Sequence, residues 1–149
     1  TRMKMKNIEL FDGYTAEIFA GLYRTFPIKG AIDARNLSGH FETDEFGTII
    51  NGKGAKSHEF EVARSTIEWL YDTGYIRGDE PSEYGISRAV LSPMGLAVLK
   101  AAPESLSASS TVGERLSQLL QSGATDAAKD LIKTALASGI TASIKAGLS

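Results

Sequence analysis

The stretch closest to a known chemical motif is Gly47-Thr48-Ile49-Ile50-Asn51-Gly52-Lys53-Gly54, which nearly spells a phosphate-binding loop. In such loops, backbone amides and a lysine hold the phosphates of a nucleotide, and a Ser or Thr after the lysine binds Mg²⁺. Here Gly54 replaces that Ser or Thr, and the preceding residues 41–46 are acidic instead of forming a buried strand. We therefore expect no nucleotide binding and no cofactor.

Metal-ion and nucleophile chemistry also lack the residues they need. Glu42, Asp44 and Glu45 could gather around a hard cation, but the spacing of a twelve-residue calcium loop is absent. His40 and His58 are the only histidines, they have no partner at ligand spacing, and the chain has no cysteine. No serine lies in a nucleophile-elbow pattern. The sequence predicts a non-enzymatic protein without a metal site.

Composition fits a soluble globular domain with an appended segment. The 149 residues are 42% apolar and 23% charged, and the formal net charge is −2, so no overall basic field attracts nucleic acid or anionic lipid. The start of the chain shows no apolar signal-peptide core, and Lys133 and Lys145 interrupt the most apolar late stretch. We expect a cytoplasmic protein without a membrane segment.

The aromatic residues divide the chain into two parts. All of them lie at or before Tyr84, so the two parts must pack differently. Residues 1–103 are predicted to form the main domain, residues 104–111 a Ser-rich connector, and residues 112–149 a helical appendix.

The first half of the main domain contains one clear helix. Apolar residues recur at helical spacing from Phe11 to Tyr23, with Asp12 as the expected N-cap and Pro27 beyond the end. Residues 28–32 are predicted to be a short strand, and residues 33–38 a short helix that ends at Gly39. A loop or hairpin with an Asn-Gly turn is expected over residues 40–56.

The second half has the order helix, two strands, helix. Ser57 is a good N-cap for a helix that ends near Gly74, and its apolar stripe consists of Phe60, Ala63, Ile67 and Leu70. Strands are predicted over residues 75–77 and 86–91, around a polar loop. Ser92-Pro93 then begins a helix that runs to Leu99.

The run from Leu70 and Gly74-Tyr75-Ile76-Arg77 to Arg88-Ala89-Val90-Leu91-Ser92-Pro93-x-Gly95 resembles the wing segment of bacterial winged helix-turn-helix regulators, including the MarR type. The resemblance covers Ile67 to Leu99. It implies an α+β, mostly α fold: a winged-helix domain, here followed by the C-terminal helical appendix, from a bacterial or phage regulator. The long insertion before Ser57 departs from the family, which joins these helices by a short turn.

In that family the helix before the wing enters the major groove and offers basic or amide side chains to DNA. The corresponding helix here turns Glu61, Glu68 and Asp72 away from its apolar stripe, and these carboxylates would repel DNA. DNA contacts are therefore expected from the basic residues on and around the wing. These are Lys53, Lys56, Arg64, Arg77 and Arg88, with the basic arm Arg2, Lys4 and Lys6. The alternative is that they are ordinary solvated charges.

Val62 and Trp69 lie seven residues apart on the same helix, off its core stripe. A tryptophan in bulk water is unusual, so another element should cover this pair. The candidates are the loop of residues 40–56, the C-terminal appendix and another subunit, and we favour the last two. Val62 and Trp69 are thus predicted to belong to an oligomer or partner interface.

The appendix is predicted to contain two helices. Thr111-Val112-Gly113-Glu114 is a capping box for the first, which ends at Gly123, and the second runs from Thr125 toward Gly139. Without aromatic residues, these helices must pack on another surface. We expect a homodimer through their apolar faces, with packing onto their own domain as the alternative. The residues of these faces are Leu116, Leu119, Leu120, Leu131, Ile132 and Leu136.

Two functions follow from this reading. The first is transcription-regulator-like binding of duplex DNA through the wing and its flanking basic residues. The second is a protein-protein interaction module that uses the winged-helix shape without DNA. Steep salt dependence of duplex binding separates the two.

Overall fold

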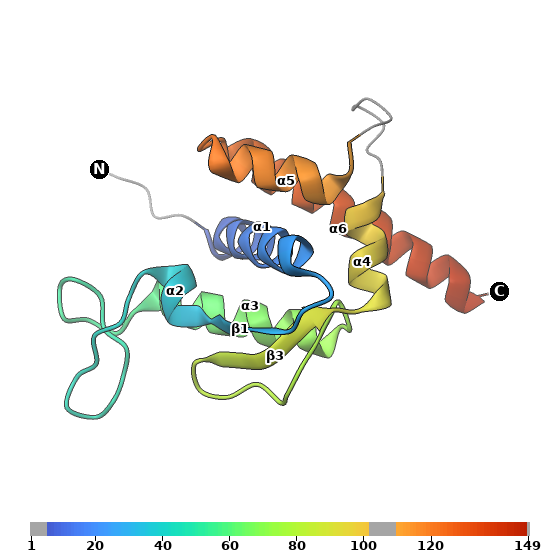
Figure 1. Ribbon diagram of the computed structural model, residues 1–149. Helices are drawn as coiled ribbons and strands as arrows, with labels where there is room; N and C mark the ends of the chain where they lie inside the picture. Colours follow the sequence, from blue (N-terminus) through green and yellow to red (C-terminus); the bar gives the residue numbers. More distant parts are fainter. Residues whose placement is uncertain (1–5, 102–109, 149) are drawn as a thin grey trace.

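The computed structural model describes residues 6–101 and 110–148, and gives the backbone alone for 139–148 (Figure 1). Within these residues the chain is α+β and mostly helical, with one three-stranded antiparallel sheet. The α+β, mostly α class expected from the sequence is therefore confirmed. The Ser-rich connector lies outside the described residues except for Ser110 and Thr111.

The first helix, α1, spans Asn7–Thr25 and begins earlier than expected. The prediction that Asp12 is its N-cap is wrong. Lys6 holds that position without a side-chain cap, and Asp12 lies in the second turn, 4% exposed and 3.8 Å from the amino group of Lys133. Leu10 and Phe11, at the end of the first turn and the start of the second, pack against the core, and this packing supports a helix that begins before Asp12.

The predicted short strand and short helix are both present. Strand β1 spans Gly30–Asp33, and α2 spans Ala34–Ser38. The Asp33 side chain caps α2 by accepting the backbone N–H of Arg35 at 2.8 Å. Gly39 ends the helix in the left-handed conformation, as its position in the sequence indicated.

The segment between α2 and α3 is a two-lobed loop that extends beyond α2 (Figure 1). Isolated bridges pair Thr43 with Ile49 and Ile50 with Lys56. Each lobe is held by one side chain: Asp44 accepts the backbone N–H groups of Phe46 and Thr48, and Asn51 accepts those of Lys53 and Ala55. The expected Asn51-Gly52 turn lies in the second lobe.

Helix α3 spans His58–Asp72 and agrees with the prediction at both ends. The Ser57 hydroxyl accepts the backbone N–H of Phe60 at 3.1 Å. Gly74 follows the helix with φ at +86°, where a side chain would be strained. Ala63, Ile67 and Leu70 are fully buried, as the apolar stripe indicated.

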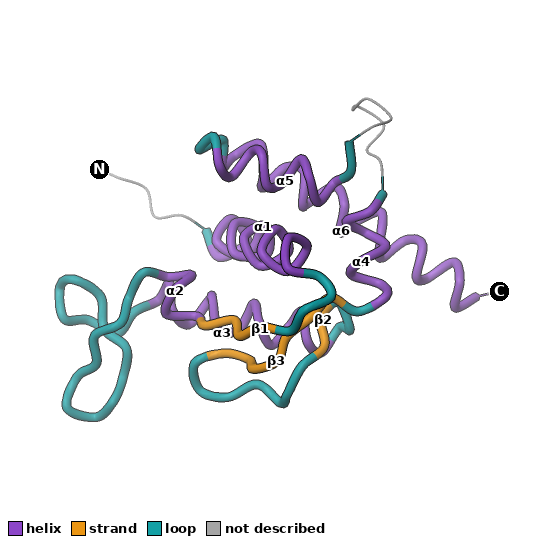
Figure 2. The backbone as a smooth tube through the Cα atoms, in the orientation of Figure 1, coloured by secondary structure: helices purple, strands orange, loops and turns teal. Residues whose placement is uncertain are grey.

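Strands β2 (Ile76–Arg77) and β3 (Gly85–Leu91) complete the sheet, in the order β1-β3-β2 (Figure 2). Ile76 pairs with Leu91 across β2 and β3. The register between β1 and β3 shifts at a bulge, and Arg88 has a positive φ of 52°. Helix α4, Pro93–Lys100, starts at the predicted Ser92 cap.

Helices α5 (Val112–Gln121) and α6 (Thr125–Leu148) pack against α1 and α4 of the same chain. The capping hydroxyl of Thr111 accepts the backbone N–H of Glu114 at 3.2 Å, as predicted. Helix α6 continues past Gly139. The predicted dimer faces lie against the rest of this chain: four of their residues are buried in the common core, and two are half-buried at its border. The buried four are Leu116, Leu119, Ile132 and Leu136; the others are Leu120 and Leu131.

This packing matches the alternative in which the appendix folds onto its own domain. Aromatic and aliphatic residues of α1 supply the surface that α5 and α6 lack by themselves. The faces of these helices are therefore occupied within the single chain. Whether the protein forms a homodimer stays a prediction.

Candidate functional site

An open groove lies between the first half of α1 and the outer side of α3, with a volume of about 1000 Å³. We call it the α1–α3 groove. Its floor and walls are mainly apolar, and the residues used below are Asn7, Ile8 and Phe11 of α1 and His58, Val62 and Trp69 of α3. The helical projection predicted that Val62 and Trp69 share an outward face, and the groove contains both.

Trp69 is the central aromatic residue of the groove. Its ring meets the Phe11 ring edge-on, with centroids 5.2 Å apart, and stacks on Tyr75 at 6.0 Å. These contacts fix the indole, yet 38% of the residue remains exposed, and Ile8 beside it is 59% exposed. The appendix or a partner chain was expected to cover Trp69. In these ring contacts Phe11 and Tyr75 cover part of the indole, and no residue of the appendix takes part in them.

Three of the five basic residues predicted to contact DNA are engaged within the chain. Lys56 lies 2.7 Å from Glu61, and Arg64 lies 2.8 Å from Glu68. Arg88 of β3 lies 3.2 Å from Asp79 in the loop between β2 and β3. Apart from the half-buried Arg64, these side chains are exposed, and such pairs contribute little stability. They nevertheless neutralise the charges that a phosphate backbone would use.

Lys53 and Arg77 are both exposed and have no ion pair within the described part of the chain. Lys53 lies in the loop before α3, and Arg77 lies in β2 after α3. The helix between them is roughly 22 Å long at 1.5 Å per residue. The two free cations are therefore at opposite ends of α3 and do not form one basic patch.

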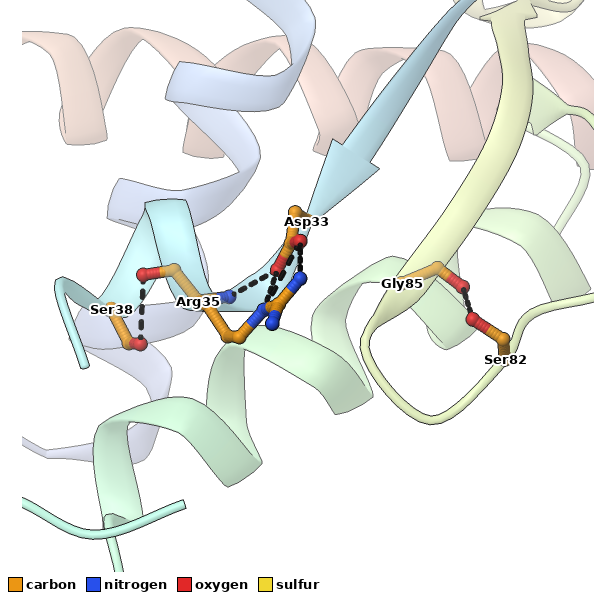
Figure 3. A network of polar contacts seen from close by, with 5 residues as sticks. All are labelled: Asp33, Arg35, Ser38, Ser82 and Gly85. Atoms are coloured by element: carbon orange, nitrogen blue, oxygen red, sulfur yellow. Dashed lines mark hydrogen bonds and ion pairs between the residues drawn. The ribbon is translucent and has the colours of Figure 1, made fainter. Parts of the chain in front are cut away.

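Two arginines, Arg35 and Arg64, contact residues at the start of α2 and in the segment between β2 and β3. Arg35 binds both carboxylate oxygens of Asp33 (Figure 3). Its guanidinium also lies 4.0 Å from the centre of the Tyr84 ring. The hydrogen bonds from Arg35 hold the pKa of the Asp33 carboxyl below its ordinary value. Arg64 donates to the carbonyl of Ser82 at 2.6 Å, so α3 is also connected to the loop between β2 and β3.

The two histidines have hydrogen-bond partners that the sequence did not reveal. His40 Nδ1 bonds to the Ser57 hydroxyl, and His58 Nε2 lies 2.6 Å from the side-chain oxygen of Asn7. Ser57 is fully buried and caps α3, so no substrate reaches its hydroxyl. This pair is a structural contact. It does not form a nucleophile site.

Other chemistry finds no support in the described residues. Among them, no group of three His, Asp or Glu side chains could hold a metal ion. None of the helices that the structure describes is long and apolar enough to cross a membrane. The near phosphate-loop motif spans both lobes of the loop, with Gly47 and Gly54 each at positive φ, and is not followed directly by a helix.

Comparison with known proteins adds no assignment: no family model, curated protein or solved structure matches the chain. The site must therefore be interpreted from its own geometry.

Proposed function

We propose that the chain is a winged-helix domain that binds a segment of another protein in the α1–α3 groove. This binding does not require duplex DNA. The element order from α1 to β3 and the sheet order β1-β3-β2 fit the winged-helix arrangement that the wing segment resembles. In that arrangement α3 is the helix that would contact DNA.

The observation that carries the proposal is the outer side of α3. It combines an open apolar groove around Trp69 with the carboxylates Glu61, Glu68 and Asp72. Exposed apolar grooves of this size are typical of binding sites for peptides and small ligands. DNA recognition needs the opposite: accessible cations and amides facing the phosphates. The only basic residue of α3, Arg64, is bound to Glu68 and Ser82.

Regulator-like DNA binding is the second candidate, and Arg77 and Lys53 favour it because both are exposed and unpaired in the described residues. A wing can contact phosphates even where the helix before it does not. A homodimer would bring two such wings together, which is the usual geometry of operator binding.

A titration of labelled duplex DNA at two salt concentrations tests the choice. We expect no saturable binding by the intact chain at low salt. If five basic residues contacted phosphates, affinity would fall by about 500-fold between about 50 and 200 mM salt, and two contacts would give only about tenfold. Tight, salt-sensitive binding that is lost in K53A and R77A would contradict the proposal.

A neutral apolar dye, Nile red, tests the groove itself. We expect its fluorescence to rise on binding the native chain and to fall back in Val62→Asp, which places a charge in the groove. Ile28→Asp is the matched control, because Ile28 is 74% exposed and does not line the groove. Equal dye binding by both variants would show that the groove is not the apolar site.

A further inference from the structure

We propose that the chain binds a second copy of itself by inserting Phe46 of one copy into a pocket beside Arg77 of the other. Phe46 lies in the first lobe of the loop before α3, residues 43–49. The pocket, which we call the Arg77 pocket, lies where α3, β2 and α4 meet. Neither residue lines the α1–α3 groove, so the inference goes beyond the proposed function and does not depend on it.

Phe46 is the residue that the first lobe presents. It is 84% exposed, more than any other large apolar residue that the structure describes. Single exposed apolar residues are common, so exposure alone does not identify a binding residue. Here, however, the backbone is held: the Asp44 carboxylate accepts the Phe46 N–H at 2.9 Å, and Thr43 pairs with Ile49 at the base of the lobe. An aromatic ring on a fixed backbone loses little conformational freedom on binding, which favours it as an anchor.

The Arg77 pocket has the properties that such an anchor needs. Its volume is about 630 Å³. Its apolar side chains come from three elements: Tyr71 of α3, Ile76 of β2 and Met94 of α4. Arg77 is the only charged residue among the described residues that line it, and it forms no ion pair within them. An arginine attracts both an aromatic ring and a carboxylate, so the pocket favours a phenyl ring with acidic neighbours.

The first lobe supplies those acidic neighbours. Glu42, Asp44 and Glu45 lie within four residues of Phe46, all three are exposed, and none forms an ion pair in the described part of the chain. Carboxylates in this number repel duplex DNA and anionic membranes. They attract a basic protein surface, and Arg77 provides the opposite charge on the same chain.

Charge also distinguishes the Arg77 pocket from the α1–α3 groove. Arg64, the arginine that lines the groove, is paired with Glu68. Glu61, which also lines it, is paired with Lys56. The charge of the first lobe therefore selects the Arg77 pocket, where the cation is unpaired in the described residues.

The contact must join two copies. The lobe comes before α3 and the pocket lies beyond its last turn, so a helix of roughly 22 Å separates them. Figure 1 shows the loop at the left and α4 toward the right of the molecule. Ile49 is 4% exposed, and its carbonyl accepts the N–H of Ser57 at 2.9 Å, which holds the lobe at the start of α3. Two copies with their α3 helices in opposite directions place each lobe at the other's pocket, which closes a symmetric dimer.

Sedimentation velocity of the intact chain over a range of concentrations measures this contact. We expect a reversible dimer whose Kd rises at least about tenfold in Phe46→Ser and in Arg77→Glu. Two matched controls should leave the Kd unchanged. Phe41→Ser removes a phenyl ring that is 57% exposed outside the lobe, and Lys53→Glu makes the same charge change as Arg77→Glu on the second lobe. Circular dichroism melting shows that each variant is folded.

A charge exchange tests complementarity separately from folding. Glu45 is exposed beside Phe46, so Glu45→Arg should weaken the dimer by placing two cations together. Combining Glu45→Arg with Arg77→Glu in one chain should restore the dimer, because the exchanged charges attract again. The effect of each single substitution should shrink in high salt.

The opposite results overturn the inference. A wild-type chain that stays monomeric up to about 1 mM has no such contact. Equal weakening by Phe46→Ser and Phe41→Ser removes Phe46 as the anchor, and equal weakening by Arg77→Glu and Lys53→Glu removes the pocket. A dimer that none of these substitutions changes is formed by another surface. In each case Nile red binding in the α1–α3 groove still tests the proposed function by itself.

Discussion

At the scale of single residues, Ser57 joins the loop to α3. Its hydroxyl accepts the Phe60 N–H and also bonds to His40. Ser57→Ala removes the cap and leaves His40 without this partner, so we expect the free energy of unfolding to fall by about 1–2 kcal/mol. Urea titration measures the loss. Ser65→Ala is the control: Ser65 is exposed within α3, and alanine there should be neutral or slightly stabilising.

Asp12 predicts a dependence of stability on pH. Burial raises the pKa of its carboxyl, although the amino groups of Lys133 and Lys129 oppose the shift. The folded chain thus binds the proton more strongly than the unfolded chain does. The stability from Asp12 is fully present below the carboxyl's ordinary pKa and is lost as pH rises through the raised value. Asp12→Asn cannot titrate, so its stability should match that of the wild type in acid and exceed it at neutral pH.

Urea titrations across this pH range test the prediction, and Lys133→Ala provides a control. Lys133 lies 3.8 Å from the carboxylate, so its removal should lower the stability of the wild type at neutral pH and leave Asp12→Asn almost unchanged. If Asp12→Asn is less stable than wild type at neutral pH, the attraction between the Asp12 carboxylate and the two lysines outweighs the cost of burying that carboxylate.

At the scale of elements, the contact between α1 and α5 depends on Gly113. A Cβ atom at this position would lie 2.6 Å from the ring of Tyr23, which also bonds to Thr111 at 3.1 Å. Gly113→Ala should therefore lower the free energy of unfolding by about 1–3 kcal/mol through overpacking. Gly21→Ala, with no atom within 4 Å of the new Cβ, should raise it by up to about 1 kcal/mol. If urea titrations showed the same change in the free energy of unfolding for Gly113→Ala and Gly21→Ala, α5 would not lie against Tyr23.

Local signals explain why so many elements could be predicted. Ser57, Ser92 and Thr111 each accept a backbone N–H three residues later, which is the contact that their position in the sequence implies. Asp12 looked similar but is an interior helical residue, because a capping residue type does not show where a helix begins when tertiary packing supports an earlier start.

The candidate site was predictable only in part. Helical spacing placed Val62 and Trp69 on one outward face, and this needs only the geometry of α3. The facing residues Ile8 and Phe11 belong to α1, and the path of the chain between the two helices determines their approach. No pattern within either helix encodes that distance. The ion pair between Lys56 and Glu61 joins the loop to α3 and was missed for the same reason.

At the scale of the whole molecule, α5 and α6 share one hydrophobic core with α1, α3 and α4. The two-part division in the sequence reflects where the aromatic residues lie. The aromatic-free helices bring leucine, isoleucine and alanine to a surface that the aromatic part already provides. Because α5 and α6 cover α1 away from the α1–α3 groove, the groove can remain open while the rest of α1 is buried.

Removal of α5 and α6 should therefore destabilise the whole chain. Leu116, Leu119, Ile132 and Leu136 are buried in the common core, and burial of each is worth about 1.5–3 kcal/mol. Their combined loss is comparable with the entire net stability of about 5–15 kcal/mol that is usual for proteins. We expect a chain that ends at Lys100 to lose its cooperative thermal transition, measured by circular dichroism, and to aggregate in sedimentation. A chain that ends at Ser138 keeps all four side chains and should retain a cooperative transition. If the shorter chain stays folded as a monomer, the main domain is independent of its appendix; if it becomes a stable dimer, a second copy can replace α5 and α6.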